Sequence, residues 1–266
     1  MKIAIAGMGL IGGSIYKAAL RAGHAAVGFR RNDAVDVSDA DVVFVALPPD
    51  SIVPWIRRHS PGFRPGTVVV DVCGVKTPVM SAMAETLPAG WIFVGGHPMA
   101  GKEVGGYENS TPDLFKGASM ILTPMPDTPD GTLEMLRALF ADLGFARVVV
   151  TDAAHHDEMI AFTSQLCHVI ASAYAQDPRV KDAVGYSAGS YANMTRIATM
   201  DPSTWASLFL ADRAALVDVL DGFIVRLGEF RDSLASSDRA SLERLIAAGA
   251  AAKRAELAMR AGGRPD

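Results

Sequence analysis

A glycine-rich stretch near the N-terminus limits what this chain can fold into. The run Gly7-Met8-Gly9-Leu10-Ile11-Gly12 fits the pattern GxGxxG, and it lies between a strand-like run and a helical pattern. In such a unit the first glycine permits a tight turn, the second lets backbone approach a pyrophosphate, and the third lets the helix pack against the strand. The helix N-terminus then offers free N–H groups to the phosphates. The sequence therefore predicts a dinucleotide site that includes Gly7, Gly9, Leu10, Ile11 and Gly12.

The first 151 residues alternate between strand-like and helical patterns. Most of the strand-like runs are continuously apolar, as expected for strands that are covered on both faces. They lie at residues 2–6, 25–29, 42–46, 67–72, 91–94, 120–123 and 147–150, and helical windows lie at 11–22, 51–59, 77–87 and 131–143. This alternation predicts an α/β fold, with a Rossmann-type, doubly wound and mostly parallel sheet over residues 1–151.

No strand pattern follows residue 150, and the rest of the chain reads as helical. Asp152 is a plausible N-cap for a helix over residues 153–175, which is apolar nearly all round and is expected to be buried. Two further helices are expected at about 213–234 and 238–259. We therefore predict an all-α C-terminal domain over residues 152–266 that makes a homodimer.

The residues after the second strand bear on the choice of cofactor. NAD sites place a carboxylate there to accept from the ribose 2′-OH, whereas this strand ends in Gly28-Phe29-Arg30-Arg31. An arginine fork can hold a 2′-phosphate, so Arg30 and Arg31 favour NADP over NAD. The alternative is that both arginines are solvated and that Asp33 or Asp36 binds the ribose. Leu47 and Pro48, which follow the third strand, complete the predicted cofactor site.

Composition excludes several other classes of protein. The net charge is −4, which gives no basic surface for nucleic acid or for an anionic membrane. No uninterrupted apolar stretch approaches the roughly 18 residues that a membrane span needs. The two cysteines, Cys73 and Cys167, have no metal-type spacing with histidines. We expect a soluble cytoplasmic protein that acts on a small molecule and holds no metal.

A second glycine-rich segment, Gly95-Gly96-His97-Pro98, follows the fifth strand. The carboxyl ends of the strands form the ligand crevice in doubly wound sheets, so His97 is expected near the nicotinamide. A neutral histidine there can take a proton from a substrate hydroxyl while a hydride leaves the same carbon. The alternative is a structural histidine that binds loop backbone.

Five segments together resemble the prephenate/arogenate (cyclohexadienyl) dehydrogenase family. They keep the order of the family's motifs and reach from the N-terminal loop to residue 205. The segments are GMGLIGGS, DVCGVK at residues 71–76, GGHPMAGKEVGG at 95–106, ILTP at 121–124 and TRIATMDPSTW at 195–205.

The resemblance implies oxidative decarboxylation of a cyclohexadienol, either prephenate or arogenate, in tyrosine biosynthesis. His97 matches the catalytic histidine of the family, and Arg196 matches the arginine that binds a substrate carboxylate. Glu103 resembles an acidic residue that can pair with that arginine. Three further positions resemble residues on the substrate side, namely His168, Gly189 and Trp205.

The chain also departs from the family pattern at two places. The family commonly has a serine before the Val-Lys pair of the second motif, and here that position is Gly74. The family's SHLPH run reads Ser164-Gln165-Leu166-Cys167-His168, which loses one histidine and the proline. Neither change removes the expected base or the arginine.

Two other functions remain open from the sequence. A β-hydroxyacid dehydrogenase or a pyrroline-5-carboxylate reductase would share the two-domain plan. Hydroxyacid dehydrogenases usually carry a catalytic lysine on the first long helix after the sheet, and no lysine lies between Asp152 and Gln176. A catalytically lapsed, NADP-binding regulator is the other alternative.

Overall fold

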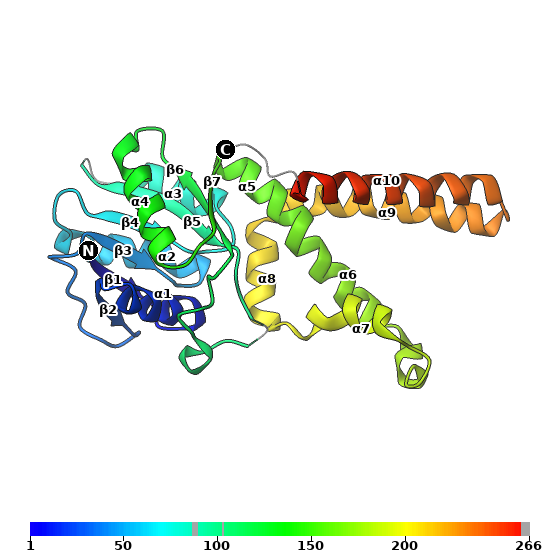
Figure 1. Ribbon diagram of the computed structural model, residues 1–266, viewed down its shortest axis with the longest axis horizontal. Coiled ribbons are helices and arrows are strands. Elements are labelled where there is room, and N and C mark those ends of the chain that lie inside the picture. The colour runs from blue at the N-terminus through cyan, green and yellow to red at the C-terminus, as the bar shows by residue number, and fades with distance from the viewer. Residues whose placement is uncertain (87–89, 103, 262–266) are drawn as a thin grey trace. The chain divides into compact units, whose positions relative to one another are not determined.

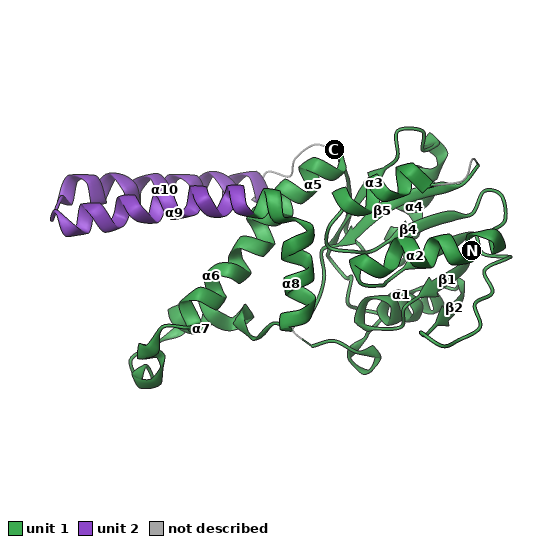
Figure 2. Cartoon of the chain, turned by 180° about the vertical axis from the view of Figure 1, so that it is seen from behind, with its two compact units in different colours: residues 1–216 green, residues 217–266 purple. Residues whose placement is uncertain are grey.

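The structure is a computed structural model, and it describes residues 1–86, 90–102 and 104–261 (Figure 1). The chain forms two compact units, Met1–Leu216 and Val217–Asp266, which Figure 2 colours separately. The first unit contains a β-sheet, the helices that cover it and several helices that follow it. The second unit contains most of one long helix and all of the next, which lie side by side in both views.

A seven-stranded sheet has the strand order β2-β1-β3-β4-β5-β6-β7. Neighbouring strands are parallel except β5 and β6, which are antiparallel. The predicted mostly parallel sheet is therefore confirmed. The strands are β1 (Lys2–Ala6), β2 (Ala25–Phe29), β3 (Val42–Val45), β4 (Val68–Asp71), β5 (Ile92–Pro98), β6 (Ser119–Pro124) and β7 (Arg147–Val150).

Helices cover both faces of this sheet. Successive side chains of a strand point to opposite faces, so Ile3 and Ile5 join one apolar cluster and Ala4 joins the other. The first cluster includes residues of α1 (Leu10–Arg21) and α4 (Asp130–Asp142), and the second includes residues of α2 (Pro49–His59) and α3 (Thr77–Thr86). These two layers of helix confirm the doubly wound fold.

The helix predicted over residues 153–175 is present, but one turn of it is π-helical. It consists of α5 (Ala153–Ile160), the π-turn Ala161–Gln165 and α6 (Leu166–Ala175). The Asp152 carboxylate accepts from the backbone N–H of His155 at 2.8 Å, so the predicted N-cap is confirmed. The expectation of a helix buried all round is wrong for the single chain, because Met159 and Phe162 are 41% and 54% exposed.

Helices α9 (Arg213–Ala235) and α10 (Arg239–Ala261) agree with the two long helices that the sequence predicts. Two shorter ones, α7 (Gly189–Thr195) and α8 (Pro202–Ala211), were not predicted. The start of α8 carries a usable signal, because the Asp201 side chain caps it and Pro202 follows. Short 3₁₀ turns lie at Ser60–Gly62, Tyr107–Asn109, Pro178–Asp182 and Arg196–Thr199. Within the described ranges, no helix is long and apolar enough to cross a bilayer.

Candidate active site

The glycine loop has the geometry that its sequence predicts. Gly7 has φ +92°, and a Cβ on it would lie 2.2 Å from the carbonyl oxygen of Ala46. A Cβ on Gly12 would lie 1.9 Å from the carbonyl oxygen of Gly7, so helix and turn meet at a distance that excludes a side chain. By contrast, among the described residues other than its two chain neighbours, no atom lies within 4 Å of the Cβ position of Gly9. The backbone at Gly9 is therefore open to a ligand.

The N-terminus of α1 can hold an anion. Its N-cap residue, Gly9, has no side chain that could cap it, and its first turn contains no acidic residue. Unsatisfied N–H groups and the positive end of the helix dipole therefore meet beside the open Gly9 backbone. This arrangement fits the pyrophosphate of a dinucleotide. Leu47 borders the same loop, since its Cδ2 atom is 2.9 Å from the Cβ position of Gly7. Pro48 is the next residue and precedes α2.

Arg30 and Arg31 directly follow β2, and both are exposed. The Arg30 guanidinium carbon lies 5.6 Å from the centre of the Tyr107 ring. Both carboxylates that could replace the arginines at the ribose already make local hydrogen bonds. Asp33 accepts from the backbone N–H of Arg30 at 2.8 Å, and Asp36 accepts from the backbone and hydroxyl of Ser38.

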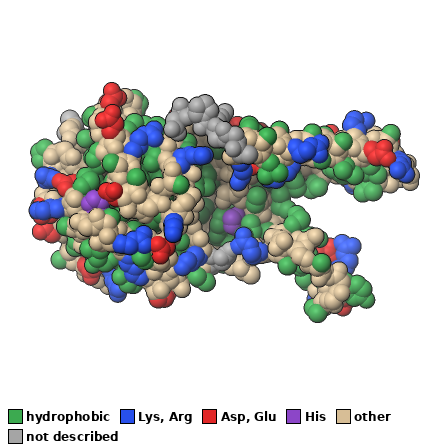
Figure 3. Space-filling view, viewed as in Figure 1, with side chains coloured by type: hydrophobic (Ala, Val, Ile, Leu, Met, Phe, Trp, Pro, Cys, Tyr) green, Lys and Arg blue, Asp and Glu red, His purple; other side chains and the backbone are tan. Residues whose placement is uncertain are grey.

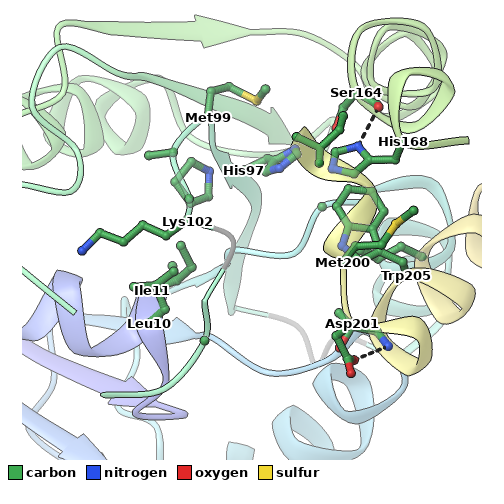
Figure 4. Close-up of a pocket in the computed structure, with 18 of the residues that line it drawn as sticks. Leu10, Ile11, His97, Met99, Lys102, Ser164, His168, Met200, Asp201 and Trp205 are labelled. Atoms are coloured by element: carbon green, nitrogen blue, oxygen red, sulfur yellow. Dashed lines mark hydrogen bonds between the residues drawn. The ribbon is translucent and has the colours of Figure 1, made fainter. Parts of the chain in front are cut away.

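A cavity of about 590 Å³ lies beside the glycine loop (Figure 4). Its walls come from the start of α1, the ends of β4 and β5, the helix formed by α5 and α6, and α8. Predicted residues of the cofactor group and of the substrate group therefore meet at one site. Those that line it are Leu10, Ile11, His97, His168 and Trp205.

His97 lies within a strand rather than in the loop that the sequence predicts. β5 extends through Pro98 because it pairs antiparallel with β6, where His97 is opposite Ile121. The preceding Gly96 is needed for close packing, since its Cβ would lie 2.5 Å from the carbonyl oxygen of Asp71. The half-buried His97 ring is thus held by a sheet, and its Nδ1 atom lies 2.9 Å from Nε2 of His156.

His156 connects His97 to a buried carboxylate. Its ring is 2% exposed, and its Nδ1 atom lies 2.7 Å from Oδ1 of Asp157. Asp157 also accepts from the backbone N–H groups of Lys76 and Thr77, each at 2.7 Å. Burial raises the pKa of Asp157, but the hydrogen bonds from His156, Thr77 and Lys76 outweigh it and hold that pKa below its ordinary value.

A buried ion pair also lies near His97. The Lys76 ammonium binds the Asp71 carboxylate, and neither side chain is exposed. Asp71 also accepts from the backbone N–H groups of Cys73 and Gly96 at 2.9 and 3.2 Å. Burial, followed by the nearby His156 and the Lys76 cation, holds the pKa of His97 well below its ordinary value. His97 is therefore neutral at pH 7, as a base must be.

His168 and Trp205 stack on each other at the far side of the cavity, with their ring centres 3.6 Å apart (Figure 4). His168 Nδ1–H donates to the carbonyl oxygen of Ser164 at 2.9 Å. Burial lowers the pKa of His168, and the charge of Arg196 lowers it further. A neutral His168 held in this way keeps Nε2 as a hydrogen-bond acceptor.

The other predicted substrate residues do not line the cavity in the part of the chain that the structure describes. Arg196 is exposed in the 3₁₀ turn Arg196–Thr199, beside Ile197, which does line the cavity. Gly189 is the exposed first residue of α7. Glu103 lies outside the described residues. Gly74 lines the cavity, and a Cβ on it would be 3.7 Å from Nε2 of His97.

Residues 1–86, 90–102 and 104–261 contain no group of three or more metal-binding side chains. The adjacent His155 and His156 point apart, since His156 is buried and His155 pairs with Glu158 at the surface at 3.3 Å. His156 and Asp157 were not predicted as site residues, although they contact His97 and the start of α3. The available signal was two adjacent polar residues on a helix expected to be buried.

Comparison with known proteins identifies the family of this chain. The family model described as the prephenate dehydrogenase nucleotide-binding domain matches residues 7–150, and the prephenate dehydrogenase dimerization domain matches residues 152–248. The cyclohexadienyl dehydrogenase of Zymomonas mobilis is 31% identical over 264 residues, which cover 89% of each chain.

Solved structures show the same fold. The arogenate dehydrogenase of Synechocystis has a TM-score of 0.83 at 24% identity, over 96% of this chain and 100% of its own. The prephenate dehydrogenase of A. aeolicus, solved with hydroxyphenyl propionate and NAD⁺, has a TM-score of 0.81 at 24% identity, over 97% and 98% of the two chains. Since two family models cover most of its length, this chain belongs to the prephenate dehydrogenase family.

Proposed function

We propose that this protein is a prephenate or arogenate dehydrogenase that uses NADP in preference to NAD. The observation that carries the proposal is that His97, a neutral base held on β5, shares one cavity with the start of α1. A dinucleotide bound at the glycine loop would reach toward His97 at this sheet edge. The family membership gives the substrate class.

The chemistry needs one base that both takes and returns a proton. A bound nicotinamide supplies the acceptor for the hydride that leaves the carbinol carbon of the ring. Nε2 of His97 takes the hydroxyl proton as the carbon–oxygen double bond forms. Carbon dioxide then leaves, the electrons of the broken bond make the ring aromatic, and His97 returns its proton to the phenolic oxygen. Substrate and oxidised cofactor thus give phenol, carbon dioxide and reduced cofactor with no net proton.

We propose that Arg196 binds the substrate's carboxylate and that His168 and Trp205 contact the substrate's ring. Both rings of the stacked pair line the cavity, and Nε2 of His168 is available as an acceptor. Arg196 lies at the edge of this wall and acts on the pKa of His168. Gly189 and Glu103 stay in the proposal as substrate-side residues on the family resemblance alone.

The NADP preference rests on the residues after β2. Arg30 and Arg31 are exposed there, and Asp33 and Asp36 are already engaged in turn hydrogen bonds. A guanidinium pair suits a 2′-phosphate, whereas an NAD ribose would lack its carboxylate acceptor. The Arg30→Ala/Arg31→Ala double variant should raise the KM for NADP by about tenfold or more and leave that for NAD within about twofold.

We also propose that the chain acts as a homodimer through residues 152–266, with residues 1–151 holding the cofactor. The first family model ends at residue 150 and the second begins at residue 152, and the second is described as a dimerization domain.

The experiment is cofactor reduction by the purified protein, followed by absorbance, with each pairing of prephenate or arogenate and NADP or NAD. Turnover with either ring substrate supports the function, and the ratio of the two cofactors tests the role of the arginine pair. If NADP binds but no pairing turns over, the dehydrogenase proposal fails and a regulator that binds NADP replaces it.

A further inference from the structure

Three side chains form a chain of hydrogen bonds whose direction can be worked out from one end. Both oxygens of Asp157 accept backbone N–H groups, Oδ1 from Lys76 and Oδ2 from Thr77, so this carboxylate acts as an acceptor. His156 Nδ1 must therefore donate to Oδ1. A neutral His156 then has a bare Nε2, which can only accept, and Nδ1 of His97 must donate to it.

This direction decides which nitrogen of His97 carries the proton. With Nδ1 protonated, a neutral His97 has a lone pair at Nε2, the nitrogen near Gly74 on the cavity wall. We propose that His156 and Asp157 are positioning residues that fix His97 in the tautomer whose Nε2 is free to take the substrate's hydroxyl proton. The inference rests on the proposed role of His97 as the base, and it assigns a function to two residues that the substrate need not touch.

The burial of these hydrogen-bonded side chains supports the assignment. His156 and Asp157 are 2% and 4% exposed, so water competes little for their hydrogen bonds. When His97 takes a proton, its Nδ1–H bond to His156 is already made and the Asp157 carboxylate lies behind it. Preorganised groups of this kind stabilise the imidazolium without rearrangement. The aspartate of a Ser-His-Asp triad acts on its histidine in the same way.

A purely structural role for Asp157 is the competing explanation. Its two backbone hydrogen bonds hold the segment that leads into α3, and α5 would be tied to that segment whatever the tautomer of His97. The test must therefore read the tautomer itself as well as activity.

The first measurement is ¹⁵N NMR of the full-length protein with labelled histidines, with the His97 and His156 signals assigned from His97→Asn and His156→Asn. At neutral pH we expect the proton of His97 on Nδ1 and a bare Nε2. A proton on Nε2 would overturn the inference. This reading of the wild-type protein does not depend on whether any variant at position 157 folds.

The second measurement uses Asp157→Asn. The new amide can still accept one backbone N–H, but its NH₂ group can donate to His156 Nδ1, which moves the proton of His156 to Nε2 and reverses the chain. We expect His97 to carry its proton on Nε2 and kcat to fall about 10²–10⁴-fold, with KM values for prephenate and NADP within about threefold. A lower Tm with an unchanged tautomer and an unchanged kcat would leave only the structural role.

Asp152→Ala is the matched control on the same helix. It removes the carboxylate that caps α5 by accepting from His155 at 2.8 Å, and it keeps the backbone hydrogen bond from His156 N–H to the carbonyl of residue 152, at 3.0 Å in the wild type. We expect a Tm lower by about 2–4 °C with the tautomer and kcat of the wild type. If this variant lost activity as Asp157→Asn does, loosening of α5 would explain both, and the positioning role would be wrong.

The pH profile gives a further reading. Beside His97 stand His156, Asp157 and Lys76, while His168, Asp201 and Lys102 line the same cavity. Asp212 also enters, because burial and the charge of Asp157 raise its pKa to about 7, and Asp157→Asn removes that charge. The difference between the two kcat/KM profiles is therefore read together with the tautomer of His97. We expect the acid limb of the wild type to lie below pH 6.5 and to shift in the variant. An unshifted limb in a slow variant would count against the inference.

The proposed function and this inference can fail separately. A protein with no turnover but with the expected tautomer would refute the dehydrogenase proposal and leave the hydrogen-bond direction intact. An active dehydrogenase whose His97 is protonated on Nε2 would refute the inference alone.

Discussion

The sheet part of the chain, residues 1–151, and the helical part, residues 152–266, bury their apolar side chains to different degrees. All four residues of β3 are fully buried, and each face of the sheet has its own apolar cluster. In α9 and α10 the only buried residue is Leu216, within the described chain, and Val225 and Ile246 are 64% and 61% exposed. Apolar side chains are visible between charged ones on the surface of these helices (Figure 3).

This difference indicates that the sheet part is stabilised by its own core, whereas the long helices leave apolar surface for another chain to cover. The sheet part buries its strands between helices on both faces. The long helices expose apolar surface that another chain can cover, which agrees with a family model described as a dimerization domain. The candidate site uses both parts, because His97 comes from β5 whereas His168 and Trp205 come from helices.

The largest expected effect is the loss of the base in the sheet part. His97→Asn should lower kcat by about 10²–10⁴-fold, because a general base contributes that much, while NADP affinity survives. Stopped-flow or steady-state turnover measures the first quantity, and titration calorimetry measures the second. Wild-type turnover in this variant would remove His97 from the chemistry.

Replacing apolar side chains in each of the two parts tests the difference in burial directly. Phe44→Ala empties a fully buried position and should cost about 3–5 kcal/mol of unfolding free energy without changing the oligomeric state. Val225→Asp/Ile246→Asp should instead raise the dimer dissociation constant by at least about tenfold. Denaturant unfolding and analytical ultracentrifugation read the two effects. If the double variant sediments as the wild type does, the exposed apolar side chains of α9 and α10 do not form the dimer interface.

A smaller effect is expected for the helical side of the site. Arg196→Ala should raise the KM for prephenate about 10–100-fold and change kcat little, since a carboxylate is bound equally in the ground and transition states. Arg196→Lys, which keeps the charge but not the fork, is the control and should recover part of the loss. An unchanged KM would place Arg196 outside the substrate site.

The smallest effect is expected at Gly74, where the two parts approach each other near His97. A Cβ there would contact Leu208 of α8 at 3.6 Å and His97 at 3.7 Å, which are ordinary van der Waals distances. Because His156 already holds Nδ1 of His97, we expect Gly74→Ser to change kcat/KM by less than about threefold. A gain above about tenfold would show that the glycine leaves the base poorly oriented.

Much of the fold was predictable because its signals are local. The first strand, the GxGxxG turn and α1 are consecutive in the chain, and the apolar runs mark the strands that the sheet buries. The position of His97 was less accurate, since the extension of β5 depends on pairing with β6, which lies more than twenty residues further on. The two short helices α7 and α8 carried too few turns for a periodic pattern to stand out.

The sequence by itself determined the doubly wound sheet and the glycine loop, because each follows from residue types at short spacing, and it predicted His97 as the base. Only the tertiary structure decided what holds that base. His97 and His156 are 59 residues apart in the chain, and no local pattern links them. Their contact exists because the sheet edge and the buried face of α5 pack together, and packing of that kind depends on the whole fold.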